Sequence, residues 1–147
     1  MEVNLKLLEN TPHSAEVIYL STGMQDVVSS RPVSPLNIGL RLLVRTSAAT
    51  GKAKDMTIKP SIAVCAGRFY FTGKAKPLGC VYGDANAEIK AAYMARYQDS
   101  FGKKDEFIQS DEVFFELAME AVSEWIFAGG NPIGFAEQRF CPETLDQ

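Results

Sequence analysis

Residues 40–66 decide the fold, and they read LRLLVRTSAATGKAKDMTIKPSIAVCA. The run from Leu40 to Thr46 is rich in leucine, valine and threonine, which is typical of a strand. The residues from Gly51 to Ile58 tolerate a helix, and Pro60 follows where a helix must stop. A second β-branched run extends from Ser61 to Ala66. The stretch therefore predicts a strand, one or two helical turns and another strand.

Further short strands flank this stretch on both sides. The residues Asn37-Ile38-Gly39 are a hairpin signal before the strand at Leu40. Each remaining strand combines β-branched or aromatic residues and ends near glycine, proline or charged residues. These strands are predicted from Glu16 through Leu20, from Val27 to Val33, from Arg68 to Lys76, from Val113 to Leu117 and from Val122 to Phe127.

Two other segments carry helical signals, and a third marks the end of the regular structure. Asp84 is a predicted N-cap for a helix that continues to about Tyr97, with a buried stripe of Ile89, Ala92 and Tyr93. Residues 1–14 predict a short helix or a packed arm. The sequence Gly129-Gly130-Asn131-Pro132 predicts the end of the ordered elements, so residues 129–147 are a tail without a predicted element.

The element order predicts an α+β fold with a dominant antiparallel sheet, most simply a barrel. A chain of 147 residues with 46% hydrophobic content has enough apolar material for one core, so residues 1–147 are predicted to form a single domain. The formal net charge of −3 argues against a nucleic-acid partner. No apolar run is long enough to span a membrane, and no secretory signal is visible, so we expect a cytoplasmic protein.

Metal and nucleophilic chemistry find little support in the residue counts. Three cysteines are an odd number at wide spacing, which argues against a disulfide framework. His13 is the single histidine and no Cys-x-x-Cys pair exists, so no metal site is predicted. No convincing Ser/His/Asp or Cys/His set is present, and no catalytic residue is assigned.

The strongest functional signal is the segment from Thr46 to Lys52, which joins the central strand to the short helix. It combines three hydroxyls, one glycine and one lysine, and these groups with the N–H groups of a helix start are what a phosphate dianion needs. The nucleotide P-loop, G-x-x-x-x-G-K-[ST], is rejected because Thr46 and Ala53 replace its first glycine and its magnesium-binding hydroxyl. A plain polar connection with a solvated lysine remains the alternative interpretation.

The ordered motifs resemble the pyridoxamine 5′-phosphate oxidase-like split barrels, and the small general stress protein branch is the nearest type. The resemblance covers roughly residues 10–128, with a weaker match from Phe114 to Trp125. The motifs that carry it are Ser30-Arg31-Pro32-Val33-Ser34-Pro35, Leu42-Leu43-Val44-Arg45-Thr46, Thr50-Gly51-Lys52-Ala53-Lys54-Asp55-Met56, Lys59-Pro60-Ser61-Ile62-Ala63-Val64 and Thr72-Gly73-Lys74-Ala75-Lys76.

The resemblance implies a six-stranded split barrel that works as a homodimer, with FMN in clefts at the subunit interface. It also implies roles for single residues. Gly51 stands where many relatives place an arginine on the phosphate, and Trp125 has a core or dimer contact as its alternative interpretation. By this likeness the flavin edge would be lined by Arg31, Pro32, Val33 and Ser34, the phosphate would be held or bordered by Arg45, Thr46, Thr50, Gly51 and Lys52, and Arg68 and Trp125 would complete the cofactor site.

Two main functions follow from this resemblance. The first is a flavin-dependent oxidoreductase that acts on an unknown small molecule, in which FMN supplies the hydride chemistry. The second is a non-enzymatic flavin-binding or sensing module. A deazaflavin F420 site, a haem site and a ligand-free dimer remain open within the same fold, although the single histidine, His13, disfavours haem.

Overall fold

The computed structural model describes residues 2–98 and 112–140. The predicted α+β class is confirmed, because helices and a mostly antiparallel sheet occur together. In chain order the elements are α1 (Leu5–Ser14), β1 (Ile18–Met24), β2 (Val27–Val33), β3 (Leu36–Ile38), β4 (Arg41–Ser47), α2 (Gly51–Ile58), β5 (Ser61–Ala66), β6 (Phe69–Cys80), the 3-10 turn η1 (Asp84–Asn86), α3 (Ala87–Arg96), β7 (Glu112–Ala128) and β8 (Asn131–Arg139).

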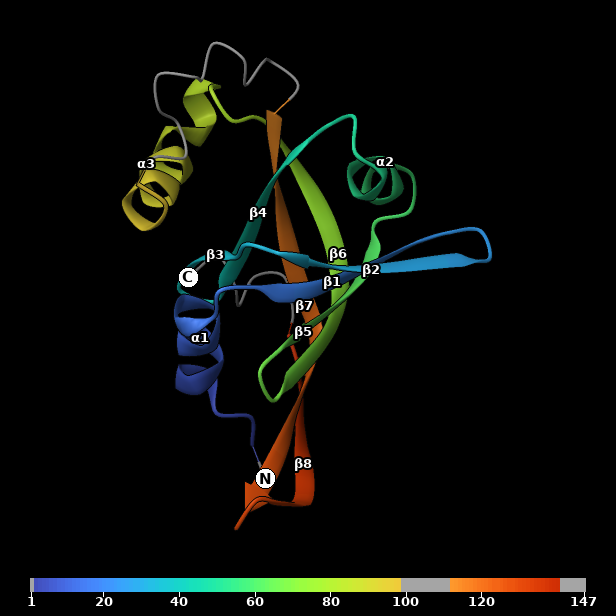
Figure 1. Ribbon diagram of the computed structural model, residues 1–147, viewed down its shortest axis with the longest axis vertical. Coiled ribbons are helices and arrows are strands. Elements are labelled where there is room, and N and C mark those ends of the chain that lie inside the picture. The colour runs from blue at the N-terminus through green and yellow to red at the C-terminus, as the bar shows by residue number, and fades with distance from the viewer. Residues whose placement is uncertain (1, 99–111, 141–147) are drawn as a thin grey trace.

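The strands form one sheet in which each neighbouring pair is antiparallel. The strand order is β2-β1-β5-β6-β7-β4-β3, and β8 pairs with β7 away from this path. The predicted count of six strands is not confirmed, since the described residues contain eight. In Figure 1, α2 lies beside the upper part of the sheet, whereas the hairpin of β7 and β8 projects from the opposite end. None of the described helices has the length and apolar character needed to cross a bilayer.

The main core lies on the inner face of the sheet, because side chains alternate between two faces along each strand. In β1, for example, Leu20 is fully buried while Tyr19 is half exposed. Helix α1 contributes Leu8 to this core and α2 contributes Met56. The two helices therefore close the inner face, and α2 is held against the sheet by its own buried side chain.

A second, smaller core lies beneath α3 on the other face of β4. The predicted helix stripe is confirmed there, because Ile89 and Tyr93 are buried against Leu43 and Phe114. The predicted N-cap at Asp84 is wrong, since Asp84 begins the 3-10 turn and α3 starts at Ala87. The helix starts later because the Asn86 side chain donates to the carbonyl oxygens of Leu78 and Cys80 at distances of 2.9 and 2.8 Å, which ties this residue to the end of β6.

The two strands predicted at 113–117 and 122–127 are one strand, β7, and that prediction is wrong. Residues Ala118 to Ala121 have weak strand propensity, but β6 pairs along them on one side. The register shifts between Thr72 and Gly73, which places the additional residue Glu120 in β7 and makes a bulge. Gly73 is required at this point, because a Cβ there would overlap the carbonyl oxygen of Ala118. Pairing within the sheet thus overrides local propensity.

The prediction that regular structure ends at Gly129 is also wrong. Gly129 and Gly130 have φ angles of +57° and +79°, and they form the two-residue turn between β7 and β8. Two successive positive φ angles match the turn that favours a tight hairpin, which glycine adopts without strain. Residues 131–139 of the predicted tail are therefore a strand, while residues 141–147 lie outside the described part of the chain.

Candidate functional site

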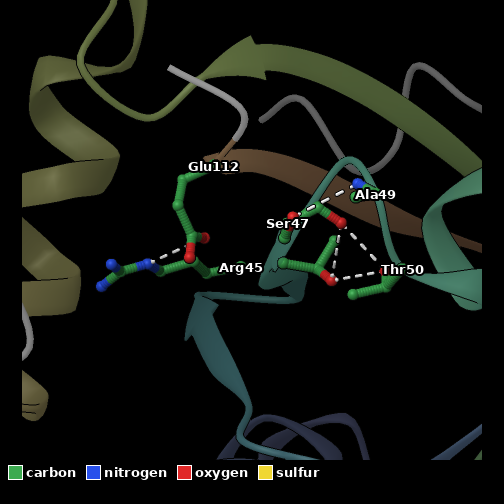
Figure 2. Close-up of polar contacts among 6 residues, drawn as sticks. Arg45, Ser47, Ala49, Thr50 and Glu112 are labelled. Carbon is green, nitrogen blue, oxygen red and sulfur yellow. Dashed lines mark hydrogen bonds and ion pairs between the residues drawn. The ribbon is translucent and has the colours of Figure 1, made fainter. Parts of the chain in front are cut away.

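The connection from β4 to α2 is organised by threonine hydroxyls. Thr50 has an extended backbone and caps α2, because its Oγ1 accepts a hydrogen bond from the N–H of Ala53 at 3.3 Å. The same hydroxyl donates to the carbonyl oxygen of Ser47 at 2.9 Å. Ser47 Oγ in turn accepts from the N–H of Ala49 at 3.2 Å. Figure 2 shows these contacts clustered at the turn, beside the first residues of α2.

Thr46 joins this group from the end of β4. Its Oγ1 lies 3.0 Å from Thr50 Oγ1, and its side chain is buried on the inner face of the sheet. The two hydroxyls fix the strand end against the helix cap. Sequence analysis selected both residues, and the structure brings them together.

The first turn of α2 presents donors toward open space. The N–H groups of Gly51 and Lys52 belong to the helix start, where no preceding turn supplies carbonyl acceptors. No described residue accepts from either group. A Cβ built on Gly51 would meet no heavy atom within 4 Å, so the side of Gly51 from which a side chain would project is open.

Lys52 is a half-buried cation at this helix start. Burial lowers the pKa of Lys52, the positive charge of Arg31 lowers it further, and the carboxylate of Glu112 opposes both effects. Arg31, which is far away in sequence, thus lies close enough in space for its positive charge to repel that of Lys52. Neither cation forms an ion pair with a described carboxylate. Two neighbouring positive charges without a paired carboxylate are a favourable environment for an anion.

Arg31 reaches this place from β2 on the inner face. Its Nη1 donates to the carbonyl oxygen of Leu20 at 3.3 Å and to Thr22 Oγ1 at 2.9 Å. Thr22 Oγ1 donates to Asp55 Oδ2 of α2, also at 2.9 Å. The arginine is thereby connected through Thr22 to the same helix that carries Lys52. Sequence reasoning did not select Thr22 or Asp55; the signal that could have found Asp55 is its position three residues after Lys52, on the same helix face.

Arg45 does not join this group. Its side chain leaves β4 on the opposite face from Thr46, as strand alternation requires. Its Nε lies 3.3 Å from Glu112 Oε2, and its guanidinium lies 5.6 Å from the centre of the Tyr93 ring in α3. Figure 2 shows Arg45 and Glu112 together on the side of α3, apart from Ser47 and Thr50. Contact between Arg45 and a phosphate at α2 would require this arrangement to change.

The other three residues selected beside Arg31 have separate environments. Val33 is buried in the main core, and Pro32 is exposed on the outer face. Ser34 lies beside Tyr97, whose hydroxyl donates to the carbonyl oxygen of Pro35 at 2.6 Å. Of this segment, only Arg31 is brought to the start of α2.

Arg68 and Trp125 lie together at the other end of the sheet. The N–H of Trp125 donates to the carbonyl oxygen of Arg68 at 3.0 Å, and Arg68 belongs to the turn between β5 and β6. The length of β5 separates this turn from α2, which corresponds to about 20 Å for six extended residues. Trp125 is 49% exposed, and its ring centre lies 5.9 Å from that of Phe135. Within one chain, these two residues are therefore separate from the group around Lys52.

A shallow hollow of about 440 Å³ lies on the sheet apart from Lys52 and is lined mainly by outer-face residues such as Ser21, Ala63 and Lys74. Thr22 belongs to its lining, together with residues of β1, β2, β5, β6 and β7. Small side chains at Gly23, Ala63 and Gly73 leave this space open. The volume lies within the range of small-molecule sites, but Thr22 is 1% exposed, so its hydroxyl on the inner face does not open into this hollow.

Comparisons with known proteins agree with this fold. No family model matches the sequence, and no curated protein matches it. A pyridoxamine 5′-phosphate oxidase-like protein from Listeria innocua has 17% sequence identity and a TM-score of 0.65, over 80% of this chain and 94% of that one. General Stress Protein 26 from Bacillus anthracis has 14% identity and a TM-score of 0.61, over 80% and 90%.

A third similar structure is named for a cofactor, which is haem. The heme binding protein from Mycobacterium smegmatis has 14% identity and a TM-score of 0.70, over 95% of this chain. This chain spans only 59% of the length of that protein. The predicted resemblance is confirmed for the fold: the chain has the architecture shared by the pyridoxamine 5′-phosphate oxidase-like split barrels.

Proposed function

We propose that this protein is a cytoplasmic flavoprotein that binds FMN with the ribityl phosphate at the start of α2. The observation that carries the proposal is that hydrogen bonds through Thr22 and Asp55 connect Arg31 to α2, the helix that carries Lys52. The hydroxyls of Thr46 and Thr50 meet at the cap of the same helix. Charged donors, hydroxyls and helix N–H groups together match the acceptor oxygens of a phosphate monoester.

The residues fit the doubly negative charge of that group. In the free protein, burial and Arg31 both disfavour the ammonium form of Lys52 and lower its pKa. A phosphate dianion beside the two cations would attract both of them. This attraction would outweigh the repulsion between Arg31 and Lys52 and would raise the pKa of Lys52 again. The open space beside Gly51 provides the approach for the phosphate.

The rest of the cofactor site is proposed to include a second copy of the chain. Arg68 and Trp125 lie at the other end of the sheet from Lys52, and a two-fold dimer would bring one copy's Arg68 end to the other copy's α2 end. The outer face of the sheet supports such an interface, because large apolar side chains are exposed on it. These are Tyr19, Tyr70, Trp125 and Phe135.

A flavin-dependent oxidoreductase of unknown small-molecule substrate is the proposed activity, and FMN, when bound, supplies the hydride chemistry. The chain's own residues bind the phosphate and orient the cofactor, and no side chain is required as a nucleophile. A non-enzymatic flavin-binding or sensing module would use the same residues. Anaerobic mixing of the FMN-loaded protein with NADH and with NADPH separates the two, since bleaching of the flavin's visible absorption indicates the oxidoreductase.

An absorption spectrum of the purified protein, recorded before and after addition of FMN, tests the cofactor directly. We expect a flavin spectrum that stays with the protein through gel filtration. Haem is titrated in parallel, because one similar structure is a heme binding protein. A protein that retains haem and ignores micromolar FMN would contradict the proposal. Sedimentation equilibrium of the wild type and of Trp125→Glu tests the dimer, with the variant expected to shift toward the monomer.

A further inference from the structure

The guanidinium of Arg31 is held on one side only. Its Nη1 makes both hydrogen bonds, to Leu20 O and to Thr22 Oγ1. No described residue accepts a hydrogen bond from its Nε or Nη2. These two nitrogens form the edge of an arginine that binds two oxygens at once. Arg41 presents this edge to a carboxylate in the same chain, where Nε and Nη2 both donate to a single oxygen, Glu116 Oε1, at 3.0 and 2.6 Å.

Thr22 can accept from Arg31 because its own proton is directed elsewhere. A hydroxyl has one proton to donate and lone pairs to accept with. Thr22 Oγ1 donates to Asp55 Oδ2, and an ionised carboxylate can only accept. The lone pairs of Thr22 therefore face Arg31. Thr22 is 1% exposed, so water does not compete for this hydroxyl.

Asp55 connects this arrangement to the helix that carries Lys52. Residues three apart share one face of a helix, so Lys52 and Asp55 lie on neighbouring positions of α2. The carboxylate of Asp55 fixes Thr22, Thr22 fixes Arg31, and Arg31 lies close to Lys52. The hydrogen bonds run from β2 through β1 to α2 and set the position of one cation relative to the other.

We propose that Thr22 and Asp55 are positioning residues that hold Arg31 with its Nε–Nη2 edge toward the ligand, and that they thereby select a terminal phosphate monoester. This inference rests on the proposed phosphate site. A terminal phosphate offers three non-bridging oxygens and two negative charges to Arg31 and Lys52. Riboflavin offers no phosphate, and each phosphate of FAD offers two non-bridging oxygens and one charge. The arrangement therefore favours FMN over both.

The test measures dissociation constants of FMN and riboflavin for the wild type, Thr22→Val, Thr22→Ser and Asp55→Asn by fluorescence titration. Thr22→Val removes the hydroxyl with little change in shape, and we expect it to weaken FMN binding about tenfold, the amount associated with one charge-assisted hydrogen bond. Riboflavin binding should stay within about twofold, because riboflavin does not use Arg31's edge. Thr22→Ser keeps the hydroxyl and should bind FMN within about threefold of the wild type.

Thr57→Val is the matched control. Thr57 lies on the exposed side of α2 and its hydroxyl donates to Ala53 O at 2.8 Å, so the variant makes the same chemical change on the same helix away from Arg31. Its FMN affinity should match that of the wild type. In an Arg31→Ala background, Thr22→Val should cause no further loss, because its effect acts through Arg31.

The outcomes separate the inference from the proposed function. Wild-type protein that binds no FMN refutes the proposed function itself. Wild-type binding together with equal FMN affinities for Thr22→Val and Thr57→Val refutes only the positioning role. A loss of FMN and riboflavin affinity by the same factor indicates a structural role and also refutes the inference. Asp55→Asn keeps the size of the side chain. If Thr22→Val does not fold, the FMN and riboflavin affinities of Asp55→Asn are compared with those of Thr57→Val instead.

Discussion

The hydroxyl oxygens of Thr46 and Thr50 lie 3.0 Å apart and join the end of β4 to the N-cap of α2. Thr46 is buried, while Thr50 caps the helix from a half-buried position. This contact places the first turn of α2 relative to the sheet. The geometry of the proposed phosphate site therefore depends on two hydroxyls that sequence analysis identified.

Thr50→Ala tests the role of this cap. The variant loses the acceptor for the Ala53 N–H and the contact with Thr46, so the free energy of unfolding should fall by about 1 kcal/mol. FMN affinity should fall as well, because the first turn of α2 is less well fixed. Thr50→Ser keeps the cap and should restore both quantities. Urea denaturation and FMN titration measure them, and unchanged stability of Thr50→Ala would exclude the cap described here.

Gly51→Arg tests whether the open space at the helix start is the phosphate side. Gly51 has room for a Cβ, because no heavy atom lies within 4 Å of the position that it would take. The added cation should strengthen FMN binding about tenfold and leave riboflavin binding unchanged. Isothermal titration calorimetry with both ligands measures the difference. Weaker FMN binding by a folded variant would show that this side of α2 does not face the phosphate.

The pH dependence of FMN affinity follows from the pKa of Lys52. In the free protein this pKa is lowered, mainly by burial and also by Arg31, and a bound phosphate dianion raises it. At pH values between the pKa of Lys52 in the free protein and its higher pKa in the complex, Lys52 is therefore protonated in the complex and deprotonated in the free protein. Affinity should be greatest below the lowered pKa and should fall as pH rises through it. It should also fall below about pH 6, where the phosphate dianion accepts a proton and becomes a monoanion.

Lys52→Arg is the control for the alkaline change. Arginine stays protonated throughout this range, so the variant should keep its FMN affinity where the wild type loses it. Fluorescence titrations of both proteins at a series of pH values provide the comparison. The same alkaline decrease in both proteins would assign it to another group.

Gly73 provides a test of the sheet rather than of the ligand site. Gly73→Ala places a methyl group against the carbonyl oxygen of Ala118 and should lower the free energy of unfolding by about 2 kcal/mol, as overpacking does. Gly51→Ala is the matched control, because space is open there and a helix position favours alanine; it should raise stability by roughly 0.5 kcal/mol. Denaturant unfolding measures both, and equal stabilities would contradict the bulge between β6 and β7.

The arrangement of the candidate site residues could be predicted from the sequence only where their contacts are local. Thr46, Thr50, Gly51 and Lys52 lie within seven residues, and a strand end followed by a helix cap determines their arrangement. Arg31 was predicted only through the resemblance, since its approach to Lys52 depends on how β1 and β2 pair and where α2 lies on the sheet. Thr22 and Asp55 were missed for the same reason, because their hydrogen bond joins residues 33 positions apart.

The fold was predicted well where local propensity and tertiary pairing agree, as in α2 and β5. It was predicted poorly in β7, because Ala118 and Ala121 are weak strand formers that stay extended through pairing with β6. The β7–β8 hairpin had a visible signal, Gly129-Gly130, that was interpreted as an end instead of a two-residue turn. Pairing along a sheet is not encoded in any single window of sequence.

The dissociation constant of FMN for Lys52→Ala, compared with Lys54→Ala, tests the central claim most directly. Lys54 is an exposed lysine on the same helix, so both variants remove one charge and differ in whether that charge lies beside Arg31. We predict that Lys52→Ala weakens FMN binding by roughly ten- to a hundredfold and that Lys54→Ala leaves it within about twofold. Equal affinities for the two variants would contradict a phosphate site at the start of α2.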